Sequence, residues 1–241
     1  MKVLITGASK GLGIIVAQSY ARRGASLILM ARTETLLNDV KNTCENPHLH
    51  RVIPLDFRDI GIPRTFDISG VDVVVHCAGG GLGMRSPTLN HSELHDLFMV
   101  NVGGQAYINS IVLPEMQKAQ RGYICHICSI ASGEAVGSVG YNTVKAALAA
   151  YVRSVGREMA PHGVVVSGIS PGGFRSPLGA MERLESNHPE VYRDFEKSRI
   201  PRCAFARAEE LLPLIHLLTG PDGSMMAGCV VPIDAGEGRY Y

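Results

Sequence analysis

MKVLITGASKGLG, residues 1–13, opens the chain. Three successive apolar residues, Val3 to Ile5, predict a short buried strand, and the pattern then changes at once to glycines. Gly7 permits a tight turn, Gly11 lets backbone approach a ligand, and Gly13 allows a following helix to pack on the strand. The N-terminus of such a helix presents free N–H groups to phosphate oxygens. The stretch therefore predicts a strand, a turn and a helix that form either a nucleotide site or an ordinary glycine-rich turn.

A second stretch, SIASGEAVGSVGYNTVK from Ser129 to Lys145, gathers three chemically active side chains. Tyr141 and Lys145 are four residues apart and share one face of a predicted helix, and the loop after a predicted strand, Gly122 to Ser129, can return Ser129 to them. A phenol is a poor proton donor at neutral pH unless a nearby cation stabilises its phenolate. The lysine can therefore make the tyrosine a usable acid, although Tyr-x-x-x-Lys alone is a weak motif.

Several motifs together resemble the classical short-chain dehydrogenases/reductases. TGASKGLG at residues 6–13, Asn101, Ser129 and YNTVK ending at Lys145 occur in that family's order and nearly at its spacing. The resemblance runs over almost all of the chain and implies a single Rossmann-type α/β domain, residues 1–241. Its fold would be a doubly wound parallel sheet of about seven strands with helices on both faces.

The resemblance also implies an enzyme that interconverts a ketone or aldehyde and an alcohol by hydride transfer. Tyr141 would be the general acid/base, Ser129 would hydrogen-bond the carbonyl oxygen, Lys145 would bind the nicotinamide ribose, and Asn101 would support the proton path. Ser129 precedes Tyr141 by twelve residues, one fewer than is common in the family, so Ser132 is the alternative serine.

The residues after the second predicted strand, Ser26 to Ala31, indicate which cofactor binds. NAD enzymes usually place an acid near the end of this strand to bind the ribose 2′-OH. Here Arg32 follows the strand and Lys10 lies inside the glycine turn, so two cations could flank a 2′-phosphate. In the family this pair resembles the pattern that prefers NADP(H) over NAD(H). The alternative is that both are solvated surface charges.

The resemblance extends to further cofactor contacts. Asp56 would contact the adenine amino group, or else cap the next turn. His76-Cys77-Ala78-Gly79 stands where the family usually has Asn-Asn-Ala-Gly, which leaves the bonding of this turn open. The expected cofactor-binding residues are Gly7, Ser9, Lys10, Gly11, Leu12, Gly13, Arg32, Asp56, Ala78, Gly79, Tyr141, Lys145, Pro171 and Gly172.

Composition and charge indicate which partners to expect. The net charge is +1 and no basic block occurs, so nothing points to nucleic acid or an anionic membrane. No stretch reaches the ~18 apolar residues of a membrane span, so we expect a cytoplasmic protein. Cys125 and Cys128 would point to opposite faces of a strand and pack in the core. His91 and His95 share a helix face without a third ligand nearby, so no metal site is expected.

The rest of the chain supplies the remaining elements and leaves the substrate open. A capped helix is predicted from Asn90 to about Lys118, and the alanine-rich helix from Tyr141 to about Ala160 suggests a homodimer or homotetramer, as in most of the family. Residues 174–202 would form a substrate lid with apolar groups, followed by a helix from Arg207 to Thr219. A 3-oxoacyl carrier-protein, a sugar and a small alcohol all remain possible substrates. Two other readings are a protein that senses NADP(H) without turnover and an enzyme that acts on nucleotide sugars.

Overall fold

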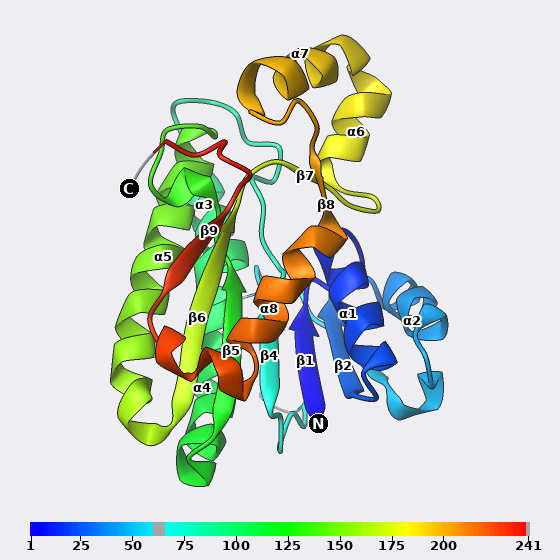
Figure 1. The fold of residues 1–241 in the computed structure, drawn as a ribbon, viewed down its shortest axis with the longest axis vertical. Coiled ribbons are helices and arrows are strands. Elements are labelled where there is room, and N and C mark those ends of the chain that lie inside the picture. The colour runs from blue at the N-terminus through cyan, green and yellow to red at the C-terminus, as the bar shows by residue number, and fades with distance from the viewer. Residues whose placement is uncertain (60–65, 240–241) are drawn as a thin grey trace.

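A computed structural model describes residues 1–59 and 66–239, and its centre is a parallel sheet (Figure 1). In the described part of the chain the sheet has seven strands in the order β3-β2-β1-β4-β5-β6-β9. The strands are β1 Lys2–Thr6, β2 Ser26–Ala31, β3 Arg51–Pro54, β4 Val73–His76, β5 Gly122–Ile127, β6 Val164–Pro171 and β9 Val230–Ile233. Every neighbouring pair is parallel. The predicted Rossmann-type doubly wound fold is thus confirmed.

Helices cover both faces of the sheet (Figure 1). Successive residues of β1 point to opposite sides: Val3 and Ile5 pack with α1, α2 and α8, whereas Leu4 packs with residues of α4 and α5. The helices are α1 Leu12–Arg22, α2 Glu34–Thr43, α3 His91–Phe98, α4 Gly104–Ala119, α5 Val139–Met159, α6 Ala180–Asn187, α7 Pro189–Arg199 and α8 Leu212–Leu218. Because all strands run the same way, the loops at their carboxyl ends meet at one edge of the sheet.

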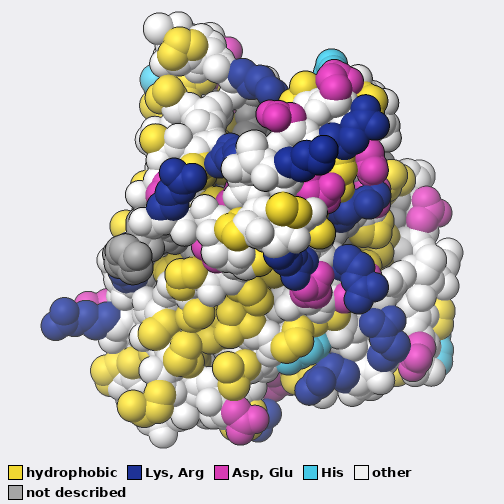
Figure 2. All heavy atoms as spheres, turned by 45° about the horizontal axis from the view of Figure 1, so that its top comes forward, with side chains coloured by type: hydrophobic (Ala, Val, Ile, Leu, Met, Phe, Trp, Pro, Cys, Tyr) yellow, Lys and Arg dark blue, Asp and Glu magenta, His cyan; other side chains and the backbone are white. Residues whose placement is uncertain are grey.

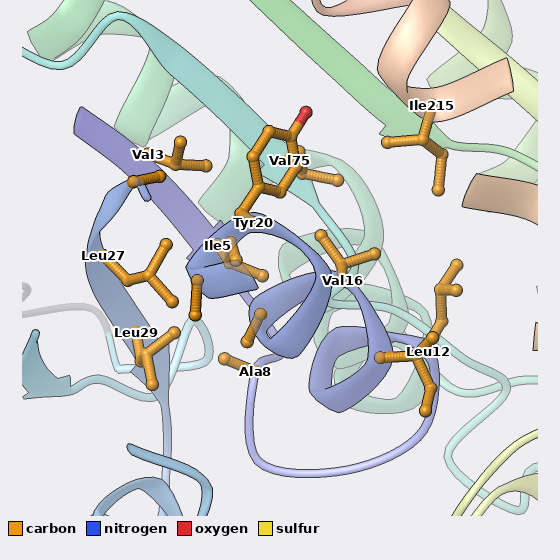
Figure 3. Packing of buried hydrophobic residues seen from close by; sticks show 14 of the residues in the cluster. Val3, Ile5, Ala8, Leu12, Val16, Tyr20, Leu27, Leu29, Val75 and Ile215 are labelled. Atoms are coloured by element: carbon orange, nitrogen blue, oxygen red, sulfur yellow. The ribbon is translucent and has the colours of Figure 1, made fainter. Parts of the chain in front are cut away.

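The opening stretch folds as its pattern predicts. Leu12, Val16 and Tyr20 of α1 belong to the same buried apolar cluster as Val3 and Ile5 of β1 (Figure 3). The chain leaves α1 through Gly24, whose φ of 76° is a conformation that glycine adopts without strain.

The predicted long helix from Asn90 is one capped helix with a defect in its middle. Asn90 accepts from the Glu93 N–H and Glu93 accepts from the Asn90 N–H, both at 2.9 Å, which confirms the predicted cap. The α-helical bonding then gives way to a π-helical segment, η2 Met99–Gly103, before α4 begins. Asn101 lies in this segment, and its Nδ2 donates to the Leu97 carbonyl at 2.9 Å.

Residues 174–207 are more regular than their loose pattern suggested. Two short parallel strands, β7 Phe174–Arg175 and β8 Ala206–Arg207, enclose α6 and α7, which stand beyond the carboxyl ends of the sheet strands (Figure 1). The apolar groups of this segment, Met181, Leu184, Tyr192 and Phe195, pack with Ile200 and Phe205 in a small core of their own. They therefore stabilise the segment, and their apolar character says little about a substrate.

Several element boundaries differ from the prediction. The helix expected over Arg207–Thr219 is instead β8, a 3-10 turn η5 Ala208–Leu211 and α8. Pro213 fits the first turn of α8, where a proline lacks no needed N–H, so the α-helix begins late. The remaining 3-10 turns are η1 Pro47–Leu49, η3 Ile130–Ser132, η4 Ala160–His162 and η6 Pro221–Met226.

Cys125 and Cys128 are buried free thiols in different apolar clusters, in agreement with the expected core role. His91 and His95 stack their rings with centroids 6.4 Å apart, His91 being exposed. Within residues 1–59 and 66–239, no group of three or more metal-ligating side chains comes together. None of the described helices is long and apolar enough to span a bilayer.

Candidate functional site

The site lies at the carboxyl ends of β1 and β4, where the strand order reverses. Gly7 and Gly11 have φ values of 67° and 65°, which favour glycine. A Cβ on Gly7 would come within 2.6 Å of the Ala78 nitrogen, and one on Gly13 within 2.3 Å of the Gly7 carbonyl oxygen. The glycines thus let the turn after β1 touch both the turn after β4 and the start of α1. Among the described residues, a Cβ on Gly11 would come near only the Ser176 hydroxyl, at 3.6 Å, so there is space beside this glycine.

Hydrogen bonds from other elements hold the turn after β4, although His76 and Cys77 replace the two asparagines that the family usually has there. The Ala78 N–H donates to Thr6 Oγ1 at 3.3 Å, and the Ala78 carbonyl accepts from Gln105 Nε2 at 2.8 Å. Asn101 holds Gly80 by a reciprocal pair, accepting its N–H at 2.9 Å and donating to its carbonyl at 3.0 Å. Both ends of the turn are therefore fixed by side chains from β1, η2 and α4.

Asn101, Tyr141 and Lys145 converge on this turn. Lys145 is 3% exposed, its Nζ donates to the Ile127 carbonyl at 2.7 Å, and it lies 5.7 Å from the centre of the Tyr141 ring. A Cβ on Gly79 would lie 2.9 Å from Asn101 Oδ1 and 3.2 Å from Lys145 Nζ. The structure therefore brings the predicted asparagine and lysine to one point, with the tyrosine beside it.

Two serines remain candidates for the carbonyl ligand. Ser129 lies two residues after the end of β5, and its Oγ accepts from the Ala131 N–H at 3.1 Å while keeping its own proton to donate. The Ser132 hydroxyl is buried without a partner among the described protein atoms.

A group of cations lies beside the glycine turn. Partial burial and the like charges of Arg183 and Arg32 lower the pKa of Lys10, so both arginines lie within electrostatic reach of this lysine. Arg183, from α6, was not foreseen from the sequence. Its Nη1 donates to the Leu178 carbonyl. A lysine with two further cations within electrostatic reach favours a nearby anion.

Asp56 takes the turn-capping role that the sequence left open. Its Oδ1 accepts the Arg58 N–H at 3.0 Å, and its Oδ2 accepts from Arg58 Nη2 at 2.6 Å. The hydrogen bonds from Arg58 hold the pKa of this carboxyl below its usual value. A hydrogen bond from the adenine amino group to Asp56 would therefore use carboxylate lone pairs that are not bonded to Arg58.

The turn after β6 carries two further groups that the sequence did not single out. Gly173 N–H donates to Glu237 Oε2 at 2.5 Å, and burial raises the pKa of this glutamate. Ser176, 7% exposed, lies beside Gly11, and the Gly11 N–H donates to the Pro177 carbonyl at 2.7 Å. The segment after Pro171 and Gly172 is thus docked on the glycine turn. The pair Ser176-Pro177, which predicts a rigid turn, is the sequence feature that could have pointed to this segment.

A small cavity of about 210 Å³ lies between the loop before α5 and the carboxyl end of the chain. It is lined by Glu134, Val136, Arg199, Glu237 and Arg239. Because Glu237 also binds Gly173, the cavity borders the turn after β6, and its lining is charged rather than apolar.

Comparison with known proteins gives a consistent picture. The family model for short chain dehydrogenases matches residues 1–187. An uncharacterized oxidoreductase of Staphylococcus epidermidis is 29% identical over 198 residues, which cover 77% of this chain and 85% of that protein. Gluconate 5-dehydrogenase of Gluconobacter oxydans is 27% identical over 245 residues, covering 98% and 93%.

Among solved structures, a 3-oxoacyl (acyl-carrier-protein) reductase of Agrobacterium tumefaciens with NADP bound matches with a TM-score of 0.86. It is 22% identical, and the match covers 98% of this chain and 93% of that one. At this identity the likeness supports the fold alone.

Proposed function

The chain belongs to the short chain dehydrogenase family and is an oxidoreductase, and we propose that it transfers hydride between NADP(H) and a ketone, aldehyde or alcohol. The observation that carries this proposal is the meeting of Asn101 and Lys145 at Gly79, beside Tyr141. This point is next to the turn of exposed glycine backbone at the carboxyl ends of β1 and β4, where ligands of open α/β sheets bind.

The residues present fit a dinucleotide. The space beside Gly11 leaves room for a phosphate, and Gly7 and Gly79 keep backbone close where a Cβ would collide with its neighbours. Ser9, Leu12 and Gly13 belong to the same turn and the start of α1. Ser176 supplies a hydroxyl beside Gly11. We assign Pro171, at the end of β6, and Gly172 after it to the nicotinamide end.

The chemistry follows from where charge develops. The nicotinamide supplies or accepts the hydride when it is bound. In the direction of reduction the carbonyl oxygen gains negative charge; Tyr141 gives it a proton and Ser129 donates a hydrogen bond to it. Lys145 holds its amino group beside the Tyr141 ring, and Asn101 fixes the Gly80 backbone across the site.

The cations favour NADP(H) over NAD(H). Arg32 and Arg183 each act on Lys10 as a like charge, and a 2′-phosphate bound beside Lys10 would offset that repulsion. Figure 2, which turns the carboxyl-terminal edge of the sheet forward, shows several Lys and Arg side chains on its right, the side of α1 and α2. The structural relative from Agrobacterium tumefaciens has NADP bound, which agrees with the proposal.

For the substrate we propose a 3-oxoacyl thioester on a carrier protein, with a sugar or small alcohol as the alternative. The first rests on the structural relative named above, and the second on gluconate 5-dehydrogenase. The charged lining of the cavity near Glu237 fits a polar substrate. We further propose that residues 174–202 act as a lid, since Pro177 binds the glycine turn.

A substrate panel tests this function. Purified protein is mixed with NADPH and, in turn, a 3-oxoacyl thioester, a keto sugar acid and simple ketones, and the decay of NADPH absorbance is followed. We expect turnover of at least one carbonyl. NADPH that binds but is consumed with none of them would favour a sensing protein over an enzyme.

The two serines can be separated by substitution. Ser129→Ala is expected to lower kcat by about 10²-fold, because it removes a donor to the developing oxyanion, whereas Ser132→Ala is expected to change kcat by less than about threefold. Steady-state kinetics on both variants, with NADPH affinity measured alongside, decides between them. The reverse order of effects would assign Ser132 to the carbonyl oxygen.

We also propose a homodimer or homotetramer. The small side chains of Ala146 and Ala150 lie exposed on α5, and Val139 at the start of that helix is 52% exposed. Figure 2 shows in addition a contiguous hydrophobic area at the lower left of its face, a feature typical of interaction surfaces. Light scattering at micromolar concentration should give twice or four times the mass of the chain, and a monomer alone would refute the proposal.

A further inference from the structure

Five polar side chains form a buried set beneath the turn after β4. They are Thr6 of β1, His76 of β4, Gln105 and Asn109 of α4, and His126 of β5, and all are 0% exposed. The two imidazole rings stack with centroids 4.6 Å apart. None of these side chains lies at the predicted site, and burying five polar groups is costly unless each finds a partner.

The direction of the hydrogen bonds follows from one carbonyl. The Ala78 carbonyl can only accept, so Gln105 turns its Nε2 toward it and its Oε1 toward His126 Nδ1, 2.6 Å away. That nitrogen must then carry a proton, which leaves His126 Nε2 to accept from Asn109 Nδ2 at 3.3 Å. The tautomer of His126 is thereby set.

The same logic continues to the second histidine. With its Nδ2 donating, Asn109 presents Oδ1 to His76 Nε2 at 2.9 Å, so this nitrogen carries the proton. His76 Nδ1 then accepts from the Thr6 hydroxyl at 3.3 Å. Thr6 Oγ1 in turn accepts the Ala78 N–H at 3.3 Å. The bonds form a closed ring that starts and ends on Ala78.

We infer that this ring positions the Ala78 turn for the cofactor, with His76 and His126 as neutral positioning residues of fixed and opposite tautomer. The inference rests on the proposed cofactor site. The ring ties both polar groups of Ala78, whose nitrogen lies 2.6 Å from the place of a Cβ on Gly7. It replaces the bonding that an Asn-Asn-Ala-Gly turn would supply.

The surroundings keep both rings neutral. Burial lowers the pKa of His76 to about 4 and that of His126 well below its usual value, and for His126 the nearby His76 and Lys145 act in the same direction. A proton on His126 Nε2 would face the Asn109 amide hydrogens and break the ring. Neutral imidazoles are the form that the bonding requires.

Gln105→Met tests the ring. Methionine keeps the length of the side chain but loses the bonds to the Ala78 carbonyl and to His126. Tyr151→Phe is the matched control, because the Tyr151 hydroxyl accepts from Asn109 at 3.1 Å and lies outside the ring. Gln105→Glu is a third variant, since a carboxylate accepts from His126 but cannot donate to Ala78.

The readouts are the Kd for NADPH, from titration of the free protein, and the Tm without cofactor. We expect the Met and Glu variants to raise Kd about tenfold and Tyr151→Phe to change it less than twofold, although Tyr151→Phe and Gln105→Met lower Tm to a similar extent. If the rise in Kd for NADPH is proportional to the loss of Tm in all three variants, the ring has only a structural role and the inference is overturned.

Nitrogen NMR of the wild-type histidines keeps the inference testable if a variant fails to fold. At pH 6 the proton should reside on Nε2 of His76 and on Nδ1 of His126. An imidazolium or the other tautomer in either ring would overturn the ring. A wild type that binds neither NADPH nor NADH would instead overturn the proposed function, and the role of the ring in cofactor binding with it.

Discussion

Tyr141→Phe is expected to lower kcat by about 10²–10⁴-fold or more, and to leave the affinity for NADPH nearly unchanged. Phenylalanine keeps the ring, which lies 2.8 Å from the place of a Cβ on Gly137, and removes only the proton that the carbonyl oxygen must receive. Single-turnover decay of NADPH absorbance with saturating substrate measures the chemical step. Retained turnover would show that Tyr141 is not the acid.

Two further variants serve as comparisons for Tyr141→Phe. Tyr123→Phe makes the same chemical change near the amino end of β5, at the opposite edge of the sheet, and should leave kcat unchanged. Lys145→Met should lower kcat and weaken NADPH binding together, because its ammonium lies beside both the Tyr141 ring and Gly79. If Lys145→Met altered kcat alone, the lysine would not serve the cofactor.

The parallel sheet could be predicted because its signals are local. Strands β1 and β4 contain the apolar runs Val3 to Ile5 and Val73 to Val75, and Gly7 and Gly13 mark the first turn and helix. Their burial follows directly, since Val3, Leu4 and Ile5 are all 0% exposed. The capping pair of Asn90 and Glu93 could be predicted for the same reason, because its partners are three residues apart.

The misjudged segments depend on contacts between distant residues. In residues 174–207, α6 and α7 are stabilised by packing on Ile200 and Phe205, which follow the two helices in the sequence. Helical spacing was present in the pairs Met181 and Leu184, and Tyr192 and Phe195, but each helix is too short for a strong pattern.

The sequence predicts the main residues of the candidate site but not the residues that hold the site's backbone in place. Asn101, Tyr141 and Lys145 could be named from motifs, and the structure brings them together. The groups that hold the Ala78 turn, Thr6 and Gln105, are 72 and 27 residues away along the chain. No local pattern joins them, and the same is true of Arg183 on α6, which lies within electrostatic reach of Lys10.

Cofactor preference rests on a balance of charge beside β2. An acid at the end of β2 would accept from ribose hydroxyls and repel a 2′-phosphate, whereas cations there attract the phosphate. Position 31 is an alanine, partly buried at the end of the strand, and Arg32 after it is exposed. The preference is therefore expected to be a property of very few side chains.

We expect the unmodified enzyme to prefer NADPH over NADH by at least about tenfold in kcat/KM. The double variant Ala31→Asp, Arg32→Ser should reverse or erase this preference. The new carboxylate would bind the ribose hydroxyls of NADH and reject the phosphate, and the loss of the guanidinium removes one attraction. The measurement is kcat/KM for NADPH and NADH with the same carbonyl substrate, at low and at physiological salt.

Arg183→Ala separates the contribution of this arginine on α6 from the contributions of Lys10 and Arg32. Because Arg183 lies near Lys10, it should weaken NADPH binding several-fold and leave NADH binding unchanged, and the effect should shrink as salt screens the charges. Arg193→Ala on α7 is a matched control, since this arginine carries the same charge on the neighbouring helix. An unmodified enzyme that uses NADH as well as NADPH would mean that Lys10, Arg32 and Arg183 are solvated surface charges, and the cofactor proposal would fall with them.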